Sequence, residues 1–426
     1  MKKITFLFLL TLLPLMASAY DTQINGIYYN LNADTKQATV TSGDTKYTGN
    51  IVIPATISYN DIVYSVISIG NSSFQDCTAL LSVTIPYGVI YLENYAFLRC
   101  SSLKSVVIPN SVTFMGETVF QNCTSLTSVS IPESLNKIEN KAFWGCTSLT
   151  SLSIPKSITT IGNSAFWGCT GLVSVTIPNS VTTIYPNAFQ NCTALKSVII
   201  PSSLHSISNS VFSHCSSLTQ VTLPNSINSI ASDAFRECTM LTSFVIPKSV
   251  TSIGWDAFSG NSNLKEIYCY AENVPDGKYA FQSFNFTNCT LHVPEASLTN
   301  YKSNVPWSKF GNIVPLKDDD PGVEKCATPT IEFSNGRLTF NCETEGVEFH
   351  YEYGNKGEGD DVDVLQAVKV SVYATKKGYN DSDVATEEIY IGGTGGIVGI
   401  KGDINEDGIV NGTDIQEVIN VIISEE

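Results

Sequence analysis

Histidine, charge and long apolar runs are scarce in this chain of 426 residues. Charged residues make up 15% of the sequence, and the four histidines are His205, His214, His292 and His350. No motif sets a nucleophile, a base and an orienting group together, so the sequence predicts no catalytic site and no enzyme. After the first 19 residues no apolar run has the length of a transmembrane helix, so we expect no membrane span.

Positive charge is also in short supply. The formal net charge is −16, and its excess is confined to one end of the chain. Residues 20–316 hold 16 acidic and 14 basic side chains, whereas residues 317–426 hold 24 acidic and 8 basic ones. Neither part offers the basic stripe that nucleic acid or an anionic membrane requires, so we expect neither as a partner.

The first 19 residues have the pattern of an export signal. Two lysines, Lys2 and Lys3, precede an apolar run from Ile4 to Leu15, and Ala17-Ser18-Ala19 follows. A positive start, a short apolar run and a small-x-small site are typical of a secretory signal peptide. We therefore interpret residues 1–19 as a signal peptide and expect the protein to be secreted or at the cell surface.

What the chain does contain is a strict repeat of 23 residues. Cysteine recurs on this period, phenylalanine precedes each cysteine by three residues, and proline follows each by nine. A ninth copy keeps its phenylalanine, Phe258, but has Asn261 in the cysteine position. The cysteines are Cys77, Cys100, Cys123, Cys146, Cys169, Cys192, Cys215 and Cys238.

One unit shows why such copies must stack. Leu149, Leu152 and Ile154 have the spacing of a strand with one apolar side, and Pro155 ends that strand because proline cannot donate to a sheet. A second short extended segment follows at residues 158–161. Residues 142–146 place apolar side chains three and four apart, which predicts a turn of helix. A single unit cannot bury these side chains, so the sequence predicts a solenoid in which each residue packs on its equivalent one coil away.

The spacing Phe-x-x-Cys-x-x-Leu-x-x-Val-x-Ile-Pro-x-Ser-Val-x-x-Ile resembles the BspA-like (Treponema pallidum type) leucine-rich repeat of bacterial surface proteins. The resemblance implies a curved right-handed solenoid and a role in adhesion or ligand contact. We place the repeats at residues 71–264. Residues 20–70 resemble an atypical first coil that shields the core, and residues 265–316 resemble a terminal cap.

The cysteine ladder permits two interpretations. Export favours disulfides, but equivalent cysteines point the same way one coil apart and cannot turn toward each other. We therefore expect buried free thiols that act as small apolar residues, and a linear ladder cannot supply the tetrahedron that zinc needs. Two other pairings stay open, Cys269 with Cys289 and Cys326 with Cys342.

Outward positions are the candidates for binding. A serine column runs along the predicted strands, with Gln220 in one copy. Trp144 and Trp167 share one repeat position in neighbouring coils, and Tyr91 and Phe114 share another. Each aromatic pair is either a platform for a sugar ring or a partner's apolar side chain, or a pair that packs only on itself.

The acidic end of the chain has a different organisation. Residues 317–325 read as a linker, because an aspartate run is followed by Pro-Gly. Residues 326–391 alternate in short segments with a hairpin signal at Asn335-Gly336, which predicts a small all-β sandwich module. This stretch weakly resembles fibronectin-type or chitobiase C-terminal modules. Residues 392–400 form a glycine-rich linker.

Residues 401–426 carry the clearest chemical pattern. The loop has oxygen side chains at the positions of an EF-hand, a glycine at its bend, and an apolar helix face after it. Position 12 holds aspartate rather than the glutamate of an EF-hand, and with the helix that follows the segment resembles one half of a type I dockerin. The predicted Ca²⁺ ligands are Asp403, Asn405, Asp407, Asn411 and Asp414 through their side chains and Ile409 through its carbonyl. The alternative is an acidic turn without a metal.

Two functions remain after these exclusions. The first is a secreted or cell-surface adhesion protein whose leucine-rich repeat solenoid binds a host protein or glycan. The second is a non-catalytic scaffold component of an extracellular glycan-degrading assembly, attached to a cohesin-like partner through the dockerin-like tail.

Overall fold

The computed structural model describes residues 20–317, 320–321, 328–334, 337–342, 348–355, 366–375 and 385–391. Residues 1–19, most of the linkers and the loop at residues 403–414 lie outside this range. The chain divides into two compact units, one up to Leu316 and one from Lys317 onward. Among the described residues, no helix has the length and apolar character needed to traverse a bilayer.

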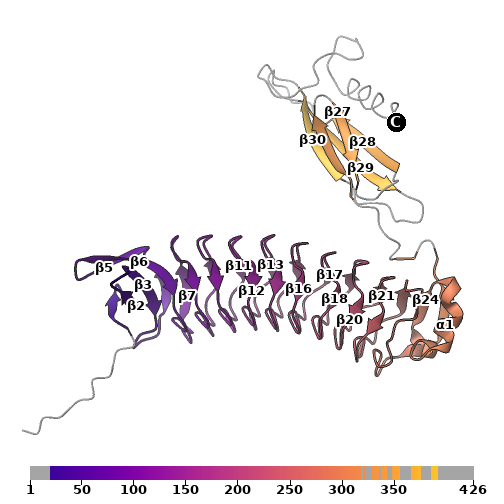
Figure 1. Cartoon of the computed structure of the whole chain (residues 1–426), viewed down its shortest axis with the longest axis horizontal. Coiled ribbons are helices and arrows are strands. Elements are labelled where there is room, and N and C mark those ends of the chain that lie inside the picture. The colour runs from indigo at the N-terminus through magenta and orange to yellow at the C-terminus, as the bar shows by residue number, and fades with distance from the viewer. Residues whose placement is uncertain are drawn as a thin grey trace, which may run out of the picture. The chain divides into compact units, whose positions relative to one another are not determined.

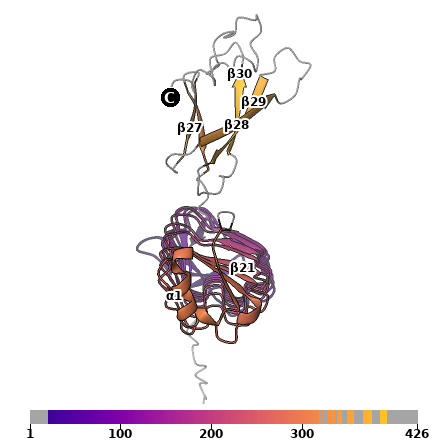
Figure 2. The same cartoon turned by 90° about the vertical axis from the view of Figure 1, so that its right-hand side faces the viewer.

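The first unit is a solenoid whose coils follow one another along a single axis (Figure 1) and overlay when seen end-on (Figure 2). One side, here called the long-strand side, consists of parallel strands with the Leu-x-x-Leu-x-Leu spacing. These strands are β4 (Gly49–Val52), β7 (Leu80–Thr84), β9 (Ser105–Val107), β11 (Ser128–Ser130), β13 (Ser151–Ser153), β15 (Ser174–Thr176), β17 (Ser197–Ile199), β19 (Gln220–Thr222), β21 (Ser243–Ile246), β23 (Glu266–Cys269), β24 (Thr290–Val293) and β25 (Asn312–Pro315).

A second side, the short-strand side, holds strands of two residues that come after each proline. These strands are β8 (Tyr91–Leu92), β10 (Phe114–Met115), β12 (Lys137–Ile138), β14 (Thr160–Ile161), β16 (Thr183–Ile184), β18 (Ser206–Ile207), β20 (Ser229–Ile230) and β22 (Ser252–Ile253). They also pair in parallel at intervals of 23 residues, as in Thr160 with Thr183. Both predicted extended segments of the repeat are therefore confirmed.

The third side, the turn side, contains the Phe-x-x-Cys segment, and here the prediction of a helical turn is wrong. Each coil has two residues with left-handed backbone, such as Lys141 (φ 55°) and Gly145 (φ 71°), which prevent a helix. The amides of Lys141, Phe143 and Gly145 donate to carbonyls of the next coil, and the amides between them close local turns. The segment therefore joins neighbouring coils by hydrogen bonds, as the strands do.

A column of phenylalanine rings fills the centre. From Phe74 to Phe281 successive rings stack with centroids 5.0–6.0 Å apart and planes within 14° of parallel. The rings from Phe74 to Phe258 are completely buried, as are the leucines that start the long strands. The predicted packing of each residue on its equivalent in the next coil is confirmed.

Both ends of this column are covered by aromatic side chains. The N-terminal strands are β1 (Thr22–Ile24), β2 (Ile27–Asn32), β3 (Gln37–Thr41), β5 (Thr56–Tyr59) and β6 (Ile62–Ile69). Near them Tyr47 lies with its ring 4.5 Å from that of Phe74. At the other end, Phe281 is in ring contact with Trp307 and Phe310. The C-terminal segments are η1 (Phe286–Asn288), η2 (Glu295–Ser297), α1 (Leu298–Ser303) and η3 (Trp307–Lys309).

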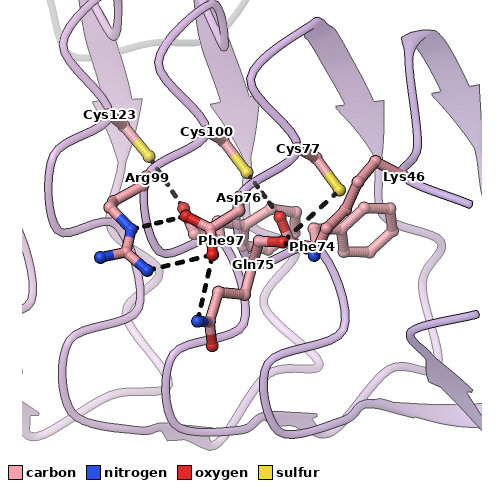
Figure 3. Close-up of polar contacts among 9 residues, drawn as sticks. All are labelled: Lys46, Phe74, Gln75, Asp76, Cys77, Phe97, Arg99, Cys100 and Cys123. Carbon is pink, nitrogen blue, oxygen red and sulfur yellow. Dashed lines mark hydrogen bonds and ion pairs between the residues drawn. The ribbon is translucent and has the colours of Figure 1, made fainter.

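The cysteines make a contact that the spacing alone does not reveal. Each thiol from Cys100 to Cys238 donates to the carbonyl of a phenylalanine in the preceding coil, as Cys100 Sγ does to Phe74 O at 3.0 Å (Figure 3). Asn261 replaces the thiol with its own donor, because its Nδ2 lies 3.0 Å from Phe235 O. The position therefore selects for a small buried donor and not only for a small apolar side chain.

The two cysteines of the C-terminal cap do not form the disulfide considered as one alternative. Cys269 and Cys289 are separate buried thiols. The register of β23 and β24 explains this, because Glu266 faces Thr290 and Cys289 thus lies about four residues along the sheet from Cys269. At ~3.3 Å per residue that offset is ~13 Å, too far for a disulfide. Cys326 lies outside the described range, so its pairing with Cys342 stays a prediction.

The second unit contains two antiparallel sheets. Strands β26 (Thr330–Ser334) and β27 (Arg337–Asn341) pair so that Ser334 faces Arg337, as the hairpin signal predicts. Strands β28 (Glu348–Asn355), β29 (Gln366–Thr375) and β30 (Ala385–Ile391) form the other sheet. Phe340 and Phe349 bring the two sheets into ring contact at 5.9 Å. A sandwich module at residues 326–391 stays a prediction.

The role of the buried donor can be tested at the one coil that lacks cysteine. Asn261→Cys restores the thiol and removes the Oδ1 of Asn261, a buried oxygen without a hydrogen-bond partner. An unsatisfied buried polar atom costs about 1–3 kcal/mol, so we expect a gain of about 1 kcal/mol in the free energy of unfolding. Urea titration followed by circular dichroism measures it.

Asn261→Ala is the matched control, because it removes the donor to Phe235 O as well as the unpaired oxygen, and it leaves a cavity. We expect this variant to be less stable than the Asn261→Cys variant. Equal midpoints for the two variants would show that neither the volume of the thiol nor its hydrogen bond stabilises this position.

Candidate binding surfaces of the solenoid

Outward side chains of the long-strand side form a column of hydroxyl groups. Ser105, Ser128, Ser151 and Ser174 are exposed, and parallel pairing sets each beside its equivalent on the next strand. Ser82 is half-buried because its hydroxyl donates to Asn50 Oδ1 at 2.7 Å. The predicted outward orientation of these serines is confirmed, and the column of hydroxyl groups ends where Glu266 pairs with Ser243.

Tyr91 and Phe114 lie side by side on β8 and β10 of the short-strand side. Their ring centroids are 6.4 Å apart, the rings are tilted by 57°, and the residues are 40% and 41% exposed. Tyr87 and Tyr95, four residues before and after Tyr91, are also exposed. We call Tyr87, Tyr91, Tyr95 and Phe114 the aromatic strip. The paired positions farther along this side are Lys137, Thr160, Thr183, Ser206, Ser229 and Ser252.

Trp144 and Trp167 lie on the turn side and have a different environment. Their rings meet edge to face at 5.0 Å and 73°, and both residues are half-buried. The Nζ of Lys141 lies 5.0 Å from the ring centroid of Trp144, and the Nε1 of Trp167 donates to Gln190 Oε1 at 3.1 Å. Lys141 and Gln190 thus already contact the two tryptophan side chains, whereas the aromatic strip is more exposed to solvent.

The sequence reasoning missed a third aromatic pair. Trp255 and Tyr279 have ring centroids 4.4 Å apart, and Trp255 is 60% exposed. The two residues are 24 positions apart and so occupy different repeat positions, and a period of 23 residues therefore does not predict that they meet. The available signal was a departure from the repeat: Trp255 stands where most coils have asparagine, serine or glutamate.

Charged side chains on the turn side pair with one another. Arg99 binds Asp76 with two hydrogen bonds of 2.5 and 3.0 Å, and this contact lowers the pKa of the exposed Asp76 carboxyl (Figure 3). Arg236 lies 3.1 Å from Asp233 Oδ1 and 3.9 Å from Asp256 Oδ2. Within the described part of the chain, no group of three or more His, Cys, Asp or Glu side chains is arranged to hold a metal ion.

The predicted calcium ligands, Asp403, Asn405, Asp407, Ile409, Asn411 and Asp414, lie outside the described residues.

The family model described as BspA type leucine rich repeat region (6 copies) matches the chain over residues 55–173 and 161–292, which together span more than half of it. The chain belongs to the BspA-type leucine-rich repeat family. Its matched copies coincide with the coils that carry the phenylalanine column.

Several solved leucine-rich repeat structures are similar to this chain. One from Bacteroides ovatus is 25% identical, with 70% of this chain and 100% of that chain covered and a TM-score of 0.34. A leucine rich cell surface protein from Faecalibacterium prausnitzii is 25% identical, with coverages of 70% and 94% and a TM-score of 0.36. The Treponema pallidum leucine-rich repeat protein is 25% identical, with coverages of 57% and 90% and a TM-score of 0.35.

These TM-scores are low, so the family assignment rests on the repeat sequence. No curated protein matches the chain.

The repeated thiols of the BspA-type coils are poor nucleophiles. Burial raises the pKa of Cys169 and of Cys215 to about 12, and it raises the pKa of Cys146 well above its ordinary value. A thiol is nucleophilic and binds metal only as the thiolate, which these side chains do not form near neutral pH. The repeated cysteines therefore contribute to the stability of the solenoid.

Because the thiol pKa values are raised, the stability of the folded solenoid decreases at alkaline pH. The folded state keeps thiol protons that the unfolded chain loses above pH 9, so folding is favoured below that pH and loses stability as pH rises toward about 12. We expect the urea midpoint to be flat from pH 7 to about 9 and to fall above it. The double variant Cys169→Ala, Cys215→Ala should show a shallower fall, and a midpoint that holds steady or rises up to pH 11 would contradict this.

Proposed function

We propose that this BspA-type solenoid is the ligand-binding module of a secreted or cell-surface protein, and that it binds an extracellular protein or glycan without catalysing a reaction. The observation that carries the proposal is the aromatic strip. Exposed tyrosine and phenylalanine side chains lie on two neighbouring coils, and the strand position that Tyr91 and Phe114 share holds Lys137 and then only threonine or serine in later coils. Large aromatic side chains supply much of the binding energy at protein interfaces.

The repeat does not require aromatic residues at the positions of Tyr91 and Phe114. Thr160, Thr183 and Ser206 occupy the same strand position in other coils, and their coils keep the same parallel pairing. Tyr91 and Phe114 are 40% and 41% exposed, so part of their apolar surface stays in water and adds nothing to stability. A role in contacting another molecule accounts for tyrosine and phenylalanine here, and the near-neutral charge of residues 20–316 favours an uncharged or mixed surface as the ligand.

Export is supported by the sequence of residues 1–19 alone. The absence of a recognised nucleophile–base arrangement in the sequence supports a non-catalytic role.

We also propose that residues 401–426 bind Ca²⁺ and attach or assemble the protein. This part of the proposal is supported by the order of oxygen ligands from Asp403 to Asp414 in the sequence. A cohesin-like partner for this segment would favour the scaffold alternative over simple adhesion, and pull-down with and without calcium separates the two.

The aromatic strip can be removed without disturbing the repeat. The double variant Tyr91→Thr, Phe114→Thr introduces the residue that other coils carry at this position. Screening the full chain against extracellular matrix proteins and glycans should give at least one ligand whose affinity falls about tenfold or more in the variant, the scale of a binding hot spot. Ser206→Ala, at the same repeat position farther along, is the control, and an identical binding profile for all three proteins would reject the proposed site.

Calcium binding by the tail is tested separately. Calorimetric titration of the full chain with Ca²⁺ should show one site, with an affinity between micromolar and millimolar as in EF-hand loops. Asp403→Ala with Asp407→Ala should abolish the heat of binding, because two of the charged ligands are lost. Asp381→Ala alters an acidic residue of the same region outside the loop and should leave it intact; no titratable site in the unaltered chain would refute the assignment.

A further inference from the structure

Two asparagines of the turn side bind the backbone of the next coil, and Trp255 occupies the equivalent repeat position; we call these two contacts the asparagine ladder. In earlier coils the equivalent side chains accept hydrogen bonds from the next coil's backbone: Asn94 Oδ1 accepts from Glu117 N, and Asn140 Oδ1 accepts from Asn163 N, both at 2.8 Å. An indole has no oxygen to accept such a bond. The corresponding amide of Lys278 instead meets Asp276 Oδ1 at 3.4 Å.

Trp255 cannot accept a hydrogen bond of this kind, and its side chain gains little burial. It is 60% exposed, and Tyr279, its neighbour at 4.4 Å, is 36% exposed. The backbone beneath both rings is fixed, because Asp233 N donates to Trp255 O at 2.8 Å and Asp256 N donates to Tyr279 O at 2.9 Å. An aromatic pair held rigidly at the surface has the properties of a preorganised binding site.

The surroundings of this pair are acidic. Each aromatic carbonyl is bonded to the amide of an aspartate, so two carboxylates accompany the rings. Arg236 pairs with both of these aspartates, and Lys278 lies with its Nζ 5.1 Å from the ring centroid of Tyr279. Glu237 also interacts electrostatically with Arg236, and Asp276 accepts from the amide of Lys278. Four acidic side chains thus accompany two basic ones near the pair: Asp233, Glu237, Asp256 and Asp276 against Arg236 and Lys278.

These features favour a cationic ligand over a sugar. Tryptophan has the strongest attraction of any side chain for a cation over its face, and a net negative surround adds to it. The polar atoms that lack partners here, Arg236 Nε and Asp256 Oδ1, are buried and cannot reach the hydroxyl groups of a saccharide. Lys141 already lies over the ring of Trp144, but no lysine or arginine among the described residues does so at Trp255.

We propose that Trp255, Tyr279, Asp233 and Asp256 form a second binding surface, which docks a basic segment of a partner protein through its arginine or lysine side chains. The proposal goes beyond the binding role assigned to the aromatic strip. It names a different surface and the charge of its partner.

Titration of the full chain with a capped tetra-arginine peptide tests the surface, with tryptophan fluorescence as the signal. All four tryptophans lie between Trp144 and Trp307, so peptide bound to the acidic tail does not contribute directly to the signal. We expect a saturable change that Trp255→Asn abolishes, asparagine being the residue of the ladder. Asp256→Asn keeps every tryptophan and should raise the half-saturating concentration roughly threefold, the effect of losing an exposed charge.

The controls separate charge from shape and this surface from the other. A tetra-citrulline peptide has similar side chains without charge and should give no signal, whereas Tyr185→Ala and the Tyr91→Thr, Phe114→Thr variant should respond as the unaltered chain does. The proposal is overturned by any of four results. These are no saturable change, a change that persists in Trp255→Asn, equal responses to the arginine and citrulline peptides, or a Trp255-dependent response to a tetrasaccharide alone.

Discussion

Each coil of this solenoid is stable because its buried side chains meet the same side chains in the next coil. The phenylalanine rings stack in parallel, and each thiol from Cys100 to Cys238 reaches back to a phenylalanine carbonyl. Truncating a buried phenylalanine in a protein core costs about 3–5 kcal/mol, more than any single surface contact contributes. The period of 23 residues follows from this packing, since an insertion in one coil would move its rings and thiols out of register with both neighbours.

The same constraint dictates how the solenoid must end. A terminal phenylalanine would leave one ring face in water, so both ends carry additional aromatic residues. Tyr47 covers the N-terminal ring, and Trp307 and Phe310 surround the C-terminal one. These capping residues do not obey the repeat, because each has only one neighbour to match. Stability in such an array is the sum of the coils and the interfaces between them, so the caps protect its outermost interfaces.

The period predicted most of the fold. Buried positions such as Leu149 and Ile158, and the end of a strand at Pro155, follow from apolar spacing and from proline's missing donor. The prediction of a helical turn was wrong because lysine, threonine and aspartate adopt left-handed backbone here as readily as glycine does. Residue type therefore does not indicate where the backbone departs from a helix. In the sequence, only Asn261 indicates the thiol hydrogen bond, because its side-chain amide replaces a donor rather than an apolar group.

At the candidate sites the repeat predicts which residues lie side by side, but it does not predict which other side chains contact them. Sharing one repeat position predicted that Trp144 and Trp167 lie together, but not that Lys141 and Gln190 would engage them. Outward positions carry little of the packing, so they can change without loss of the fold, and a residue that abandons a local hydrogen bond there calls for an explanation outside the fold. Pro186 also interrupts the asparagine ladder, yet it adds no exposed aromatic surface. Trp255 cannot accept the bond that Asn94 and Asn140 accept, and it presents an open indole, so an exception of this kind has a functional meaning only where the new side chain offers binding energy.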